Sequence, residues 1–182
     1  DTLFFFAEGR KHSCDDYGYH DLVCHKSTDK GRTFRNCSDS TALVNVTEVW
    51  GASQLGYHHN ISCCGGGIYD PTPVLDERTG EIFVFFSFRP TQLNNPSKKT
   101  DPQGGETYLI SSTDGGDTFS APVNITSLFS TSPHYPTPDT NCTGGLCQVC
   151  SPTGAGGGGI QTSNGTLLVP GYHVDCNWME FV

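Results

Sequence analysis

The sequence has few basic residues and no long apolar segment. Its 10 Lys and Arg are outnumbered by 19 Asp and Glu in 182 residues, which gives a net charge of −9, and the basic residues are scattered. We therefore expect neither a nucleic acid nor an anionic membrane surface as a partner. Apolar stretches such as Leu3–Ala7 are far shorter than the roughly 20 residues that cross a bilayer, so no membrane span is expected.

Helical patterning is also absent, because no segment of about ten residues or more keeps a 3.6-residue period. Glycine and proline are frequent instead, with 22 and 11 residues against a single methionine, and the short apolar stretches lie between turn residues. This pattern predicts an all-β fold for residues 1–182, as one domain or part of a larger one. Residues 91–106 and 127–153 are predicted to be long surface loops.

Acceptor triplets for N-glycosylation are unusually frequent. Six of the nine asparagines stand in Asn-x-Ser/Thr triplets, where about two would be expected by chance. These are Asn36, Asn45, Asn60, Asn124, Asn141 and Asn164. The excess predicts a protein made in the secretory pathway, and hence lysosomal or extracellular.

Nine cysteines fit the same compartment, since disulfides persist where the environment is oxidising. Their pairing cannot be deduced from the sequence, and the odd total indicates a free thiol or a partner outside this segment. Zinc is the alternative, because the sequence places together His12, Cys14, His20, Cys24 and His25, and has a CxxC at Cys147 and Cys150. No second CxxC stands at finger or ribbon spacing, so we predict no metal and no cofactor.

An octamer with the pattern S-x-D-x-G-x-T-F occurs twice, at Ser27–Phe34 and Ser112–Phe119. Its Asp can accept hydrogen bonds from turn N–H groups, its Gly can take a positive φ, and its Thr-Phe resumes a strand with the ring turned into the sheet. Each octamer is therefore predicted to be a turn that carries its own apolar side chain. Such turns suit a protein that repeats similar four-stranded sheets, as a β-propeller does.

Five motifs occur in the order found in sialidases. They are Phe6–Arg10 (FAEGR), the pair Asp15–Asp16 before Gly18, the two octamers, Asp70–Val74 before Thr79–Gly80, and Gly159–Gln161 before Leu168–Pro170. The sequence thus resembles the exo-α-sialidases, or neuraminidases, of the lysosomal and bacterial type, in which such octamers are called Asp boxes or BNR repeats. The resemblance implies a six-bladed β-propeller, of which this chain would be roughly the first half.

The resemblance also implies a reaction, the hydrolysis of terminal sialic acid from a glycoprotein, glycolipid or oligosaccharide. Because the sugar carries a carboxylate on its anomeric carbon, retaining sialidases use a tyrosine nucleophile beside an acid/base carboxylate. Asp16 matches that acid/base, and Asp15 is its rival. A solvated turn made by this pair with Gly18 is the structural alternative.

Substrate-binding residues are implied in the same way. Arg10 matches the arginine on the hydroxyl side of the sugar, and Glu8, on the same strand face, would orient it, although such a pair can also be a plain structural salt bridge. Asp70 matches a pocket-lining residue, while an Asp-Pro turn is its simpler interpretation. Gln161 and Tyr172 match a segment lining the pocket from a neighbouring blade. No chemistry is assigned to five histidines, which are His12, His20, His58, His59 and His173.

Departures from the family pattern leave other functions open. The nucleophilic tyrosine, its glutamate and the three carboxylate-binding arginines have no counterpart here, so we expect this segment alone to be inactive. A half-propeller would also expose a strand edge and half a core, so we expect it to be poorly folded. Gly156–Gly159 replaces a segment that usually contains a serine, and 127–153 has no counterpart that we recognise. The alternatives are a non-catalytic sialoside-binding propeller, a trans-sialidase and, least favoured, a structural propeller such as a sorting receptor.

Overall fold

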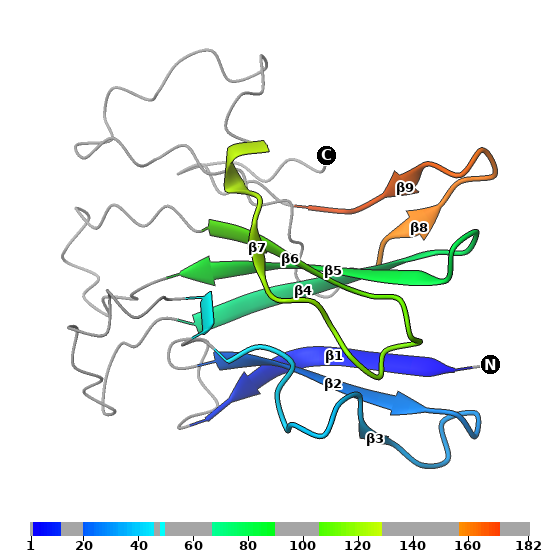
Figure 1. Cartoon of the computed structure of the whole chain (residues 1–182), viewed down its shortest axis with the longest axis horizontal. Coiled ribbons are helices and arrows are strands. Elements are labelled where there is room, and N and C mark those ends of the chain that lie inside the picture. Colours follow the sequence, from blue (N-terminus) through cyan, green and yellow to red (C-terminus); the bar gives the residue numbers. More distant parts are fainter. Residues whose placement is uncertain are drawn as a thin grey trace.

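A computed structural model describes residues 2–11, 20–45, 48–49, 67–89, 106–128 and 157–171 (Figure 1). These ranges contain nine strands, one short 3-10 helix, η2 (Thr126–Leu128), and two further helical residues, Glu48 and Val49. The expectation of an all-β fold with almost no helix is therefore confirmed for the described residues. None of their helices is long and apolar enough to span a membrane.

The strands form three antiparallel sheets. The first has the order β1 (Leu3–Arg10), β2 (His20–Ser27) and β3 (Arg35–Asn36). The second has the order β4 (Gly67–Asp76), β5 (Glu81–Arg89), β6 (Glu106–Ser112) and β7 (Val123–Asn124). The third pairs β8 (Ile160–Gln161) with β9 (Leu167–Leu168).

The sheets follow one another in space as they do along the chain (Figure 1). Strand β4 contacts both β1 and β8, so the first strands of successive sheets lie side by side. Strands β3 and β7 are the last strands of the first and second sheets and form their opposite edges. A succession of antiparallel sheets whose first strands lie side by side is the arrangement of propeller blades.

The strand register gives the sheets two distinct ends. Arg10 pairs with His20 at one end of the first sheet, and Leu3 pairs with Ser27, the first residue of an octamer, at the other. In the second sheet, Ile82 likewise pairs with Ser112, where the other octamer begins. We call these the Arg10 end and the octamer end; seven residues of strand separate them, or about 23 Å.

Alternating apolar residues build the core between the first two sheets. In β5 the fully buried side chains include Val84 and Phe86, which alternate with the half-buried Phe83 and Phe85. Leu22 of β2, Ile68 of β4 and Ile110 of β6 complete the centre of the same cluster. The core therefore depends on the period-two pattern of the strands, as half-buried sheets require.

Both octamers form the predicted turns and make the same local hydrogen bonds. The prediction that Thr-Phe resumes a strand is wrong, because the next strands begin only at Arg35 and Val123, and the Phe34 ring is exposed and not turned into the sheet. In the first, Asp29 accepts bonds from the backbone N–H and the hydroxyl of Thr33, and the Ser27 hydroxyl accepts one from the Gly31 N–H. In the second, Asp114, Thr118, Ser112 and Gly116 make the corresponding bonds. The octamer glycines Gly31 and Gly116 have φ of 82° and 78°, and their predecessors Lys30 and Gly115 are also left-handed, with φ of 64° and 70°.

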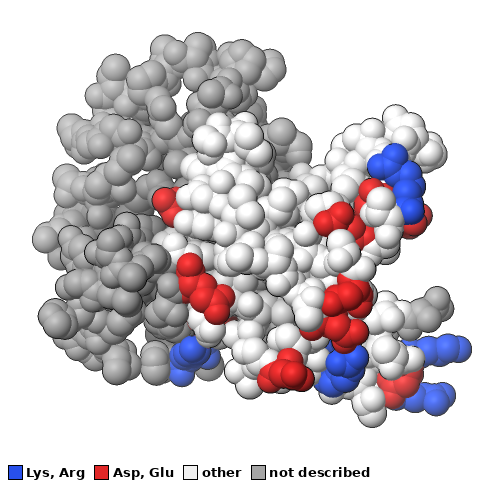
Figure 2. All heavy atoms as spheres, in the orientation of Figure 1, with Lys and Arg blue, Asp and Glu red and all other residues white. Residues whose placement is uncertain are grey.

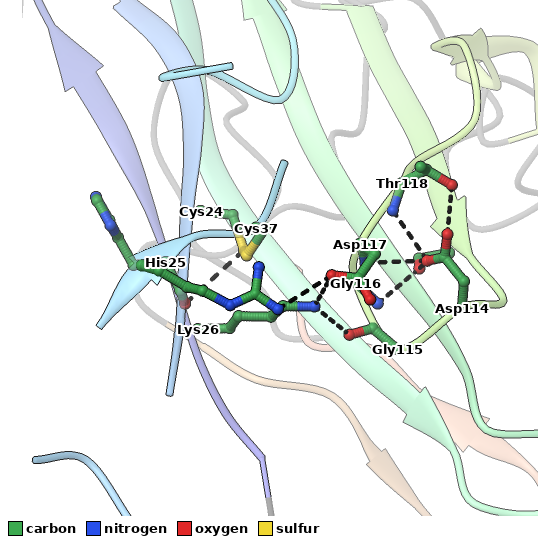
Figure 3. A network of polar contacts seen from close by, with 11 residues as sticks. Cys24, His25, Lys26, Cys37, Asp114, Gly115, Gly116, Asp117 and Thr118 are labelled. Atoms are coloured by element: carbon green, nitrogen blue, oxygen red, sulfur yellow. Dashed lines mark hydrogen bonds and ion pairs between the residues drawn. A yellow bond between two sulfur atoms is a disulfide. The ribbon is translucent and has the colours of Figure 1, made fainter. Parts of the chain in front are cut away.

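The second octamer also joins the first two sheets (Figure 3). The buried Lys26 ammonium of β2 donates to the Asp117 carboxylate and to the Gly115 carbonyl. Phe119 packs edge-on against Phe6 of β1, with the ring centres 6.2 Å apart. The octamer phenylalanine is therefore packed against the neighbouring sheet, whereas Phe34 of the first octamer is 51% exposed.

Some sequence expectations need correction at their boundaries. Glu106, placed in the loop 91–106, begins β6, while the rest of that loop lies outside the described residues. Within the loop 127–153, Ser127 and Leu128 belong to η2, and positions 129–153 are likewise not described. Cys24 forms a disulfide with Cys37, so it is not available as a thiolate ligand in the zinc alternative.

Charged side chains are interspersed on the face drawn in Figure 2, where the described residues show no continuous basic patch. Acidic groups prevail there, as expected from the net charge of −9. That surface offers no footprint for a phosphate backbone.

Candidate active site

Glu8 and Arg10 form the centre of a charged cluster at the Arg10 end. They lie two residues apart on β1, so both side chains project from the same strand face. The Arg10 guanidinium donates through Nε and Nη2 to one Glu8 oxygen, Oε2, at 3.3 and 3.0 Å. The side chain of Arg10 remains 32% exposed and that of Glu8 only 16%, so the carboxylate holds the arginine from beneath.

Glu8 also reaches two other strands. Its second oxygen, Oε1, accepts a hydrogen bond from the backbone N–H of Asp70 on β4, at 3.2 Å. Its Oε2 lies 3.4 Å from Nδ1 of His20 on β2. One carboxylate thus connects three strands from two sheets, which fixes Arg10 and Asp70 relative to each other.

Asp70 has an unusual backbone conformation. Its φ of 55° is left-handed, and the β4–β5 pairing shifts register between Tyr69 and Thr72, which marks a bulge. The Thr72 hydroxyl closes this bulge by donating to the Asp70 carbonyl at 3.2 Å. Aspartate tolerates the left-handed region better than most residues, and bulges commonly redirect a side chain beside a functional site. The Asp-Pro signal therefore marks a bulge within a strand and not a separate turn.

His20 is the residue of this cluster that sequence reasoning missed. It is buried, with 1% of its surface exposed, and its ring lies 4.8 Å from that of Tyr69, centre to centre. Its Nδ1 lies 3.4 Å from the Glu8 carboxylate, which also contacts Arg10 and Asp70. A sequence signal existed in hindsight, since His20 begins the strand that pairs with the end of FAEGR, but only the register shows that it lies opposite Arg10.

Asp16 lies outside the described residues, as does Asp15. The segment 12–19 that contains them joins two strand ends that the structure does describe, because Arg10 pairs with His20. Just beyond that pair, Lys11 Nζ lies 2.6 Å from the buried Asp21 carboxylate. The two attachment points of the segment are therefore held together beside the charged cluster.

Gln161 is not brought to this cluster. Its amide donates to Asp76 at 2.7 Å and its oxygen accepts from the Glu77 backbone N–H at 2.9 Å. Asp76 is the last residue of β4, about 20 Å along the strand from Asp70 and at the octamer end. Gln161 thus braces the β4–β5 turn, and this placement argues against the substrate contact implied by the resemblance.

Residues at the same turn keep the Asp76 carboxyl group ionised. Hydrogen bonds from the Arg78 side chain and then from Gln161 hold the pKa of the Asp76 carboxyl well below its ordinary value. Asp76 therefore stays charged at neutral and mildly acidic pH. Its hydrogen bonds go to these local partners, so its role is structural.

Tyrosines are of interest because the implied reaction uses one as its nucleophile. Tyr172 lies outside the described residues. Tyr108 is buried in the core, where desolvation and then the neighbouring Glu106 raise its pKa to about 12. A phenol this hard to ionise stays protonated at neutral pH, so Tyr108 is unsuited to nucleophilic attack.

The cluster can bind a polar, oxygen-rich ligand. Arg10 presents a fixed and partly exposed cation, whose planar donors suit hydroxyl or carboxylate oxygens. Asp70, half-buried beside it, supplies a carboxylate that can accept hydroxyl hydrogens. Among the described residues no group of three His, Cys, Asp or Glu side chains is arranged to hold a metal ion.

The fold and this cluster together define a class: a propeller-type protein with a polar site at the end of the sheets opposite the repeated turns. No protein-family model matches the chain. Two curated relatives are exo-alpha-sialidases. That of Arthroderma benhamiae is 29% identical over 185 residues, and that of Aspergillus fumigatus is 28% identical over 181 residues; each match covers 92% of this chain and 37% of the relative.

Solved structures give the same result for the fold. The Hadza microbial sialidase Hz136 matches 96% of this chain with a TM-score of 0.65 at 23% identity, over 30% of its own length. The intramolecular trans-sialidase of Ruminococcus gnavus matches 99% with a TM-score of 0.64 at 14% identity, over 55% of its length. The resemblance to sialidases is therefore confirmed, and the chain spans 37% of the length of the curated relatives it matches.

Proposed function

We propose that the complete protein containing this chain is a retaining exo-α-sialidase. It would hydrolyse terminal α-linked sialic acid from glycoproteins, glycolipids or oligosaccharides, on a six-bladed propeller of which this chain is roughly the first half. The observation that carries the proposal is the Glu8-held Arg10 beside the Asp70 bulge, at the end of the sheets opposite both octamers. A purely structural Asp-box propeller gives no reason for this exposed arginine.

Each residue of the cluster receives a role in this proposal. Arg10 binds sugar oxygens, Glu8 orients Arg10, and Asp70 accepts hydrogen bonds from sugar hydroxyls. Asp16 protonates the leaving oxygen and later removes a proton from the attacking water. Tyr172 remains a proposed pocket residue, whereas we do not propose a substrate contact for Gln161.

The exposed apolar surface of the first sheet supports a larger propeller. Phe5 and Phe34 are 59% and 51% exposed. In the second octamer the corresponding phenylalanine, Phe119, packs against the sheet before it. The same relation would pack Phe34 against a further sheet of the complete protein, so this segment alone would leave apolar surface in water and be poorly folded and inactive.

A secretory location, lysosomal or extracellular, is part of the proposal. The disulfide between Cys24 and Cys37 supports it, since such bonds form and persist in oxidising compartments. The excess of Asn-x-Ser/Thr triplets supports it independently.

The test uses the complete protein and two substrates, an aryl sialoside with a good leaving group and 3′-sialyllactose with a poor one. Asp16→Asn should lower kcat about a hundredfold or more on sialyllactose, and less on the aryl sialoside, because only a poor leaving group needs the proton. Asp15→Asn is the matched control and should stay within a few fold of the parent. Activity of Asp16→Asn within about tenfold on sialyllactose would refute the acid/base role.

Product analysis separates the remaining functions. With a galactoside acceptor present, a hydrolase releases free sialic acid, whereas a trans-sialidase forms a new sialoside. Absence of any turnover, together with saturable binding of the sialoside, would instead identify a binding propeller.

A further inference from the structure

Two of the Asn-x-Ser/Thr triplets each form the same kind of local hydrogen bond. The side-chain oxygen of Asn124 accepts a bond from the backbone N–H of Thr126 at 3.0 Å. In the same way, that of Asn164 accepts one from Thr166 at 3.1 Å. Each triplet therefore forms an Asx turn that ends on its hydroxyl residue. Both asparagines are exposed.

This geometry prepares the amide nitrogen for reaction. The bond to Oδ1 stabilises the negative charge that gathers on this oxygen when Nδ2 loses a proton. Since the contact spans only two residues, it can form in a nascent chain before the sheets assemble.

The asparagines of the other described triplets are less exposed. Asn45 is half-buried, and its Nδ2 donates to the Glu48 carboxylate at 3.3 Å. Asn36 is half-buried beside the disulfide-bonded Cys37. Asn60 and Asn141 lie outside the described residues. The structure thus singles out Asn124 and Asn164 on two grounds, exposure and turn geometry.

Both asparagines lie away from the charged cluster around Glu8. Asn124 lies on β7, the edge strand of the second sheet, three strands or about 14 Å from β4, which carries Asp70. Its Nδ2 donates to the Tyr108 hydroxyl at 3.3 Å, a bond that the one N–H left after substitution can keep. Asn164 lies in the turn between β8 and β9, at the octamer end.

We propose that Asn124 and Asn164 are N-glycan acceptor sites and that the glycan on Asn124 covers β7, the edge strand of the second sheet among the described residues. The donor is a lipid-linked oligosaccharide diphosphate. A bond forms between Nδ2 and the anomeric carbon, the bond from that carbon to the diphosphate oxygen breaks, and the amide proton and the lipid diphosphate leave. An uncovered edge strand is a template for pairing with another chain, so a bulky hydrophilic group at this position opposes self-association.

Site occupancy is measured on the complete protein secreted by a eukaryotic host. Peptide N-glycosidase in ¹⁸O water converts each glycosylated asparagine to a labelled aspartate, which peptide mass spectrometry locates. We expect the label at 124 and 164. An unlabelled peptide at either position would overturn the assignment of that site, whether or not other triplets are labelled, and this result is independent of sialidase activity.

The edge-covering role is tested with Asn124→Asp and a matched control, Thr126→Ser. Aspartate keeps the oxygen that accepts the Thr126 N–H but cannot take the glycan, whereas serine keeps both the triplet and the hydroxyl that accepts the Thr107 N–H. We expect more dimer and higher oligomers for Asn124→Asp by light scattering, and parent behaviour for Thr126→Ser. If Asn124→Asp stays as monomeric as the parent, the edge-covering role is wrong. Enzymatic deglycosylation of the folded parent repeats the measurement without a variant.

Discussion

The carboxylate of Glu8 on β1 accepts a hydrogen bond from the backbone N–H of Asp70 on β4, 62 residues later in the chain. The same carboxylate binds the Arg10 guanidinium through its other oxygen. One half-buried side chain therefore sets the distance between a cation on one sheet and a carboxylate-bearing residue with a left-handed backbone on the next. Displacing Glu8 would move both groups that are proposed to bind the sugar.

Glu8→Gln tests this arrangement. Glutamine keeps an oxygen for the Asp70 N–H but removes the charge that holds Arg10, and a hydrogen bond to a charged group contributes about 1.5–3 kcal/mol. We expect the KM for a sialoside to rise about tenfold or more in the complete protein, with a smaller fall in kcat. Glu77→Gln, an exposed carboxylate at the octamer end, is the control. Equal kcat and KM values for the two variants would show that Glu8 does not position the substrate-binding groups.

Two adjacent glycines of the second octamer allow the stability cost of backbone strain to be measured separately from the cost of crowding. Both have positive φ, but a Cβ on Gly115 meets nothing within 4 Å, whereas a Cβ on Gly116 would overlap the Phe4 ring. Gly115→Ala should therefore lower the free energy of unfolding by about 1–2 kcal/mol, the left-handed penalty alone. Gly116→Ala should cost a further 1–3 kcal/mol for overpacking.

Urea unfolding of the complete protein measures both variants. Lys30→Gly provides the reverse change, because Lys30 occupies in the first octamer the left-handed position of Gly115, with φ of 64°. It should be neutral or slightly stabilising. Equal losses for the two alanine variants would show that Phe4 moves aside.

The contact between Lys26 and Asp117 predicts unequal effects of its two single substitutions. Lys26 has only 3% of its side chain exposed, whereas Asp117 has 57% and a second partner in Arg35. Asp117→Ala leaves a buried ammonium with fewer acceptors, so we expect a loss of about 1–3 kcal/mol. Lys26→Met leaves a solvated carboxylate and should cost less. Chemical unfolding of both single variants and the double variant gives the coupling, and a larger loss for Lys26→Met would contradict the burial argument.

Acid should weaken the two octamers together. Bonds from the Thr33 backbone N–H and hydroxyl lower the pKa of Asp29 to about 2, and bonds from Thr118 hold the pKa of Asp114 well below its ordinary value. Because both folded pKa values are depressed, their contribution to stability is present above the unfolded value of about 3.9 and is lost as the pH falls toward 2.

Thermal unfolding between pH 5 and pH 2 checks this. Asp114→Asn should lower the Tm at pH 5 and flatten its fall toward pH 2 compared with the parent, because one of the groups that takes up a proton on unfolding is absent. An unchanged slope would mean that other carboxyls dominate the acid transition.

Much of the fold could be predicted because its signals are local. The octamer turns follow from the placement of Asp, Gly and Thr within eight residues. Strand β5, Glu81–Arg89, contains a continuous apolar run between turn residues, a pattern that is visible without knowledge of the neighbours. The pairing of Glu8 with Arg10 could also be predicted from a local signal, because residues two apart on a strand lie on the same face.

The rest depends on contacts between distant segments. Nothing near His20 in the sequence indicates that it lies against Glu8, because that contact requires the β1–β2 register. Asp70 was chosen from a motif, but its bulge appears only when β4 pairs with β5. Gln161 was placed in the pocket by analogy, while its partners Asp76 and Glu77 precede it by 85 and 84 residues. A motif gives the order of such segments along the chain but not the end of the sheet that each one reaches.

The Ser, Asp and Thr side chains of the turns at Ser27–Phe34 and Ser112–Phe119 find hydrogen-bond partners within their own octamer. A gene segment encoding one sheet with its turn could therefore be duplicated without new polar partners for these side chains, while Asp117 adds a contact to the neighbouring sheet through Lys26. Evolution can accordingly change the residues at the Arg10 end, and with them the ligand preference, while the octamer turns at the opposite end stay the same.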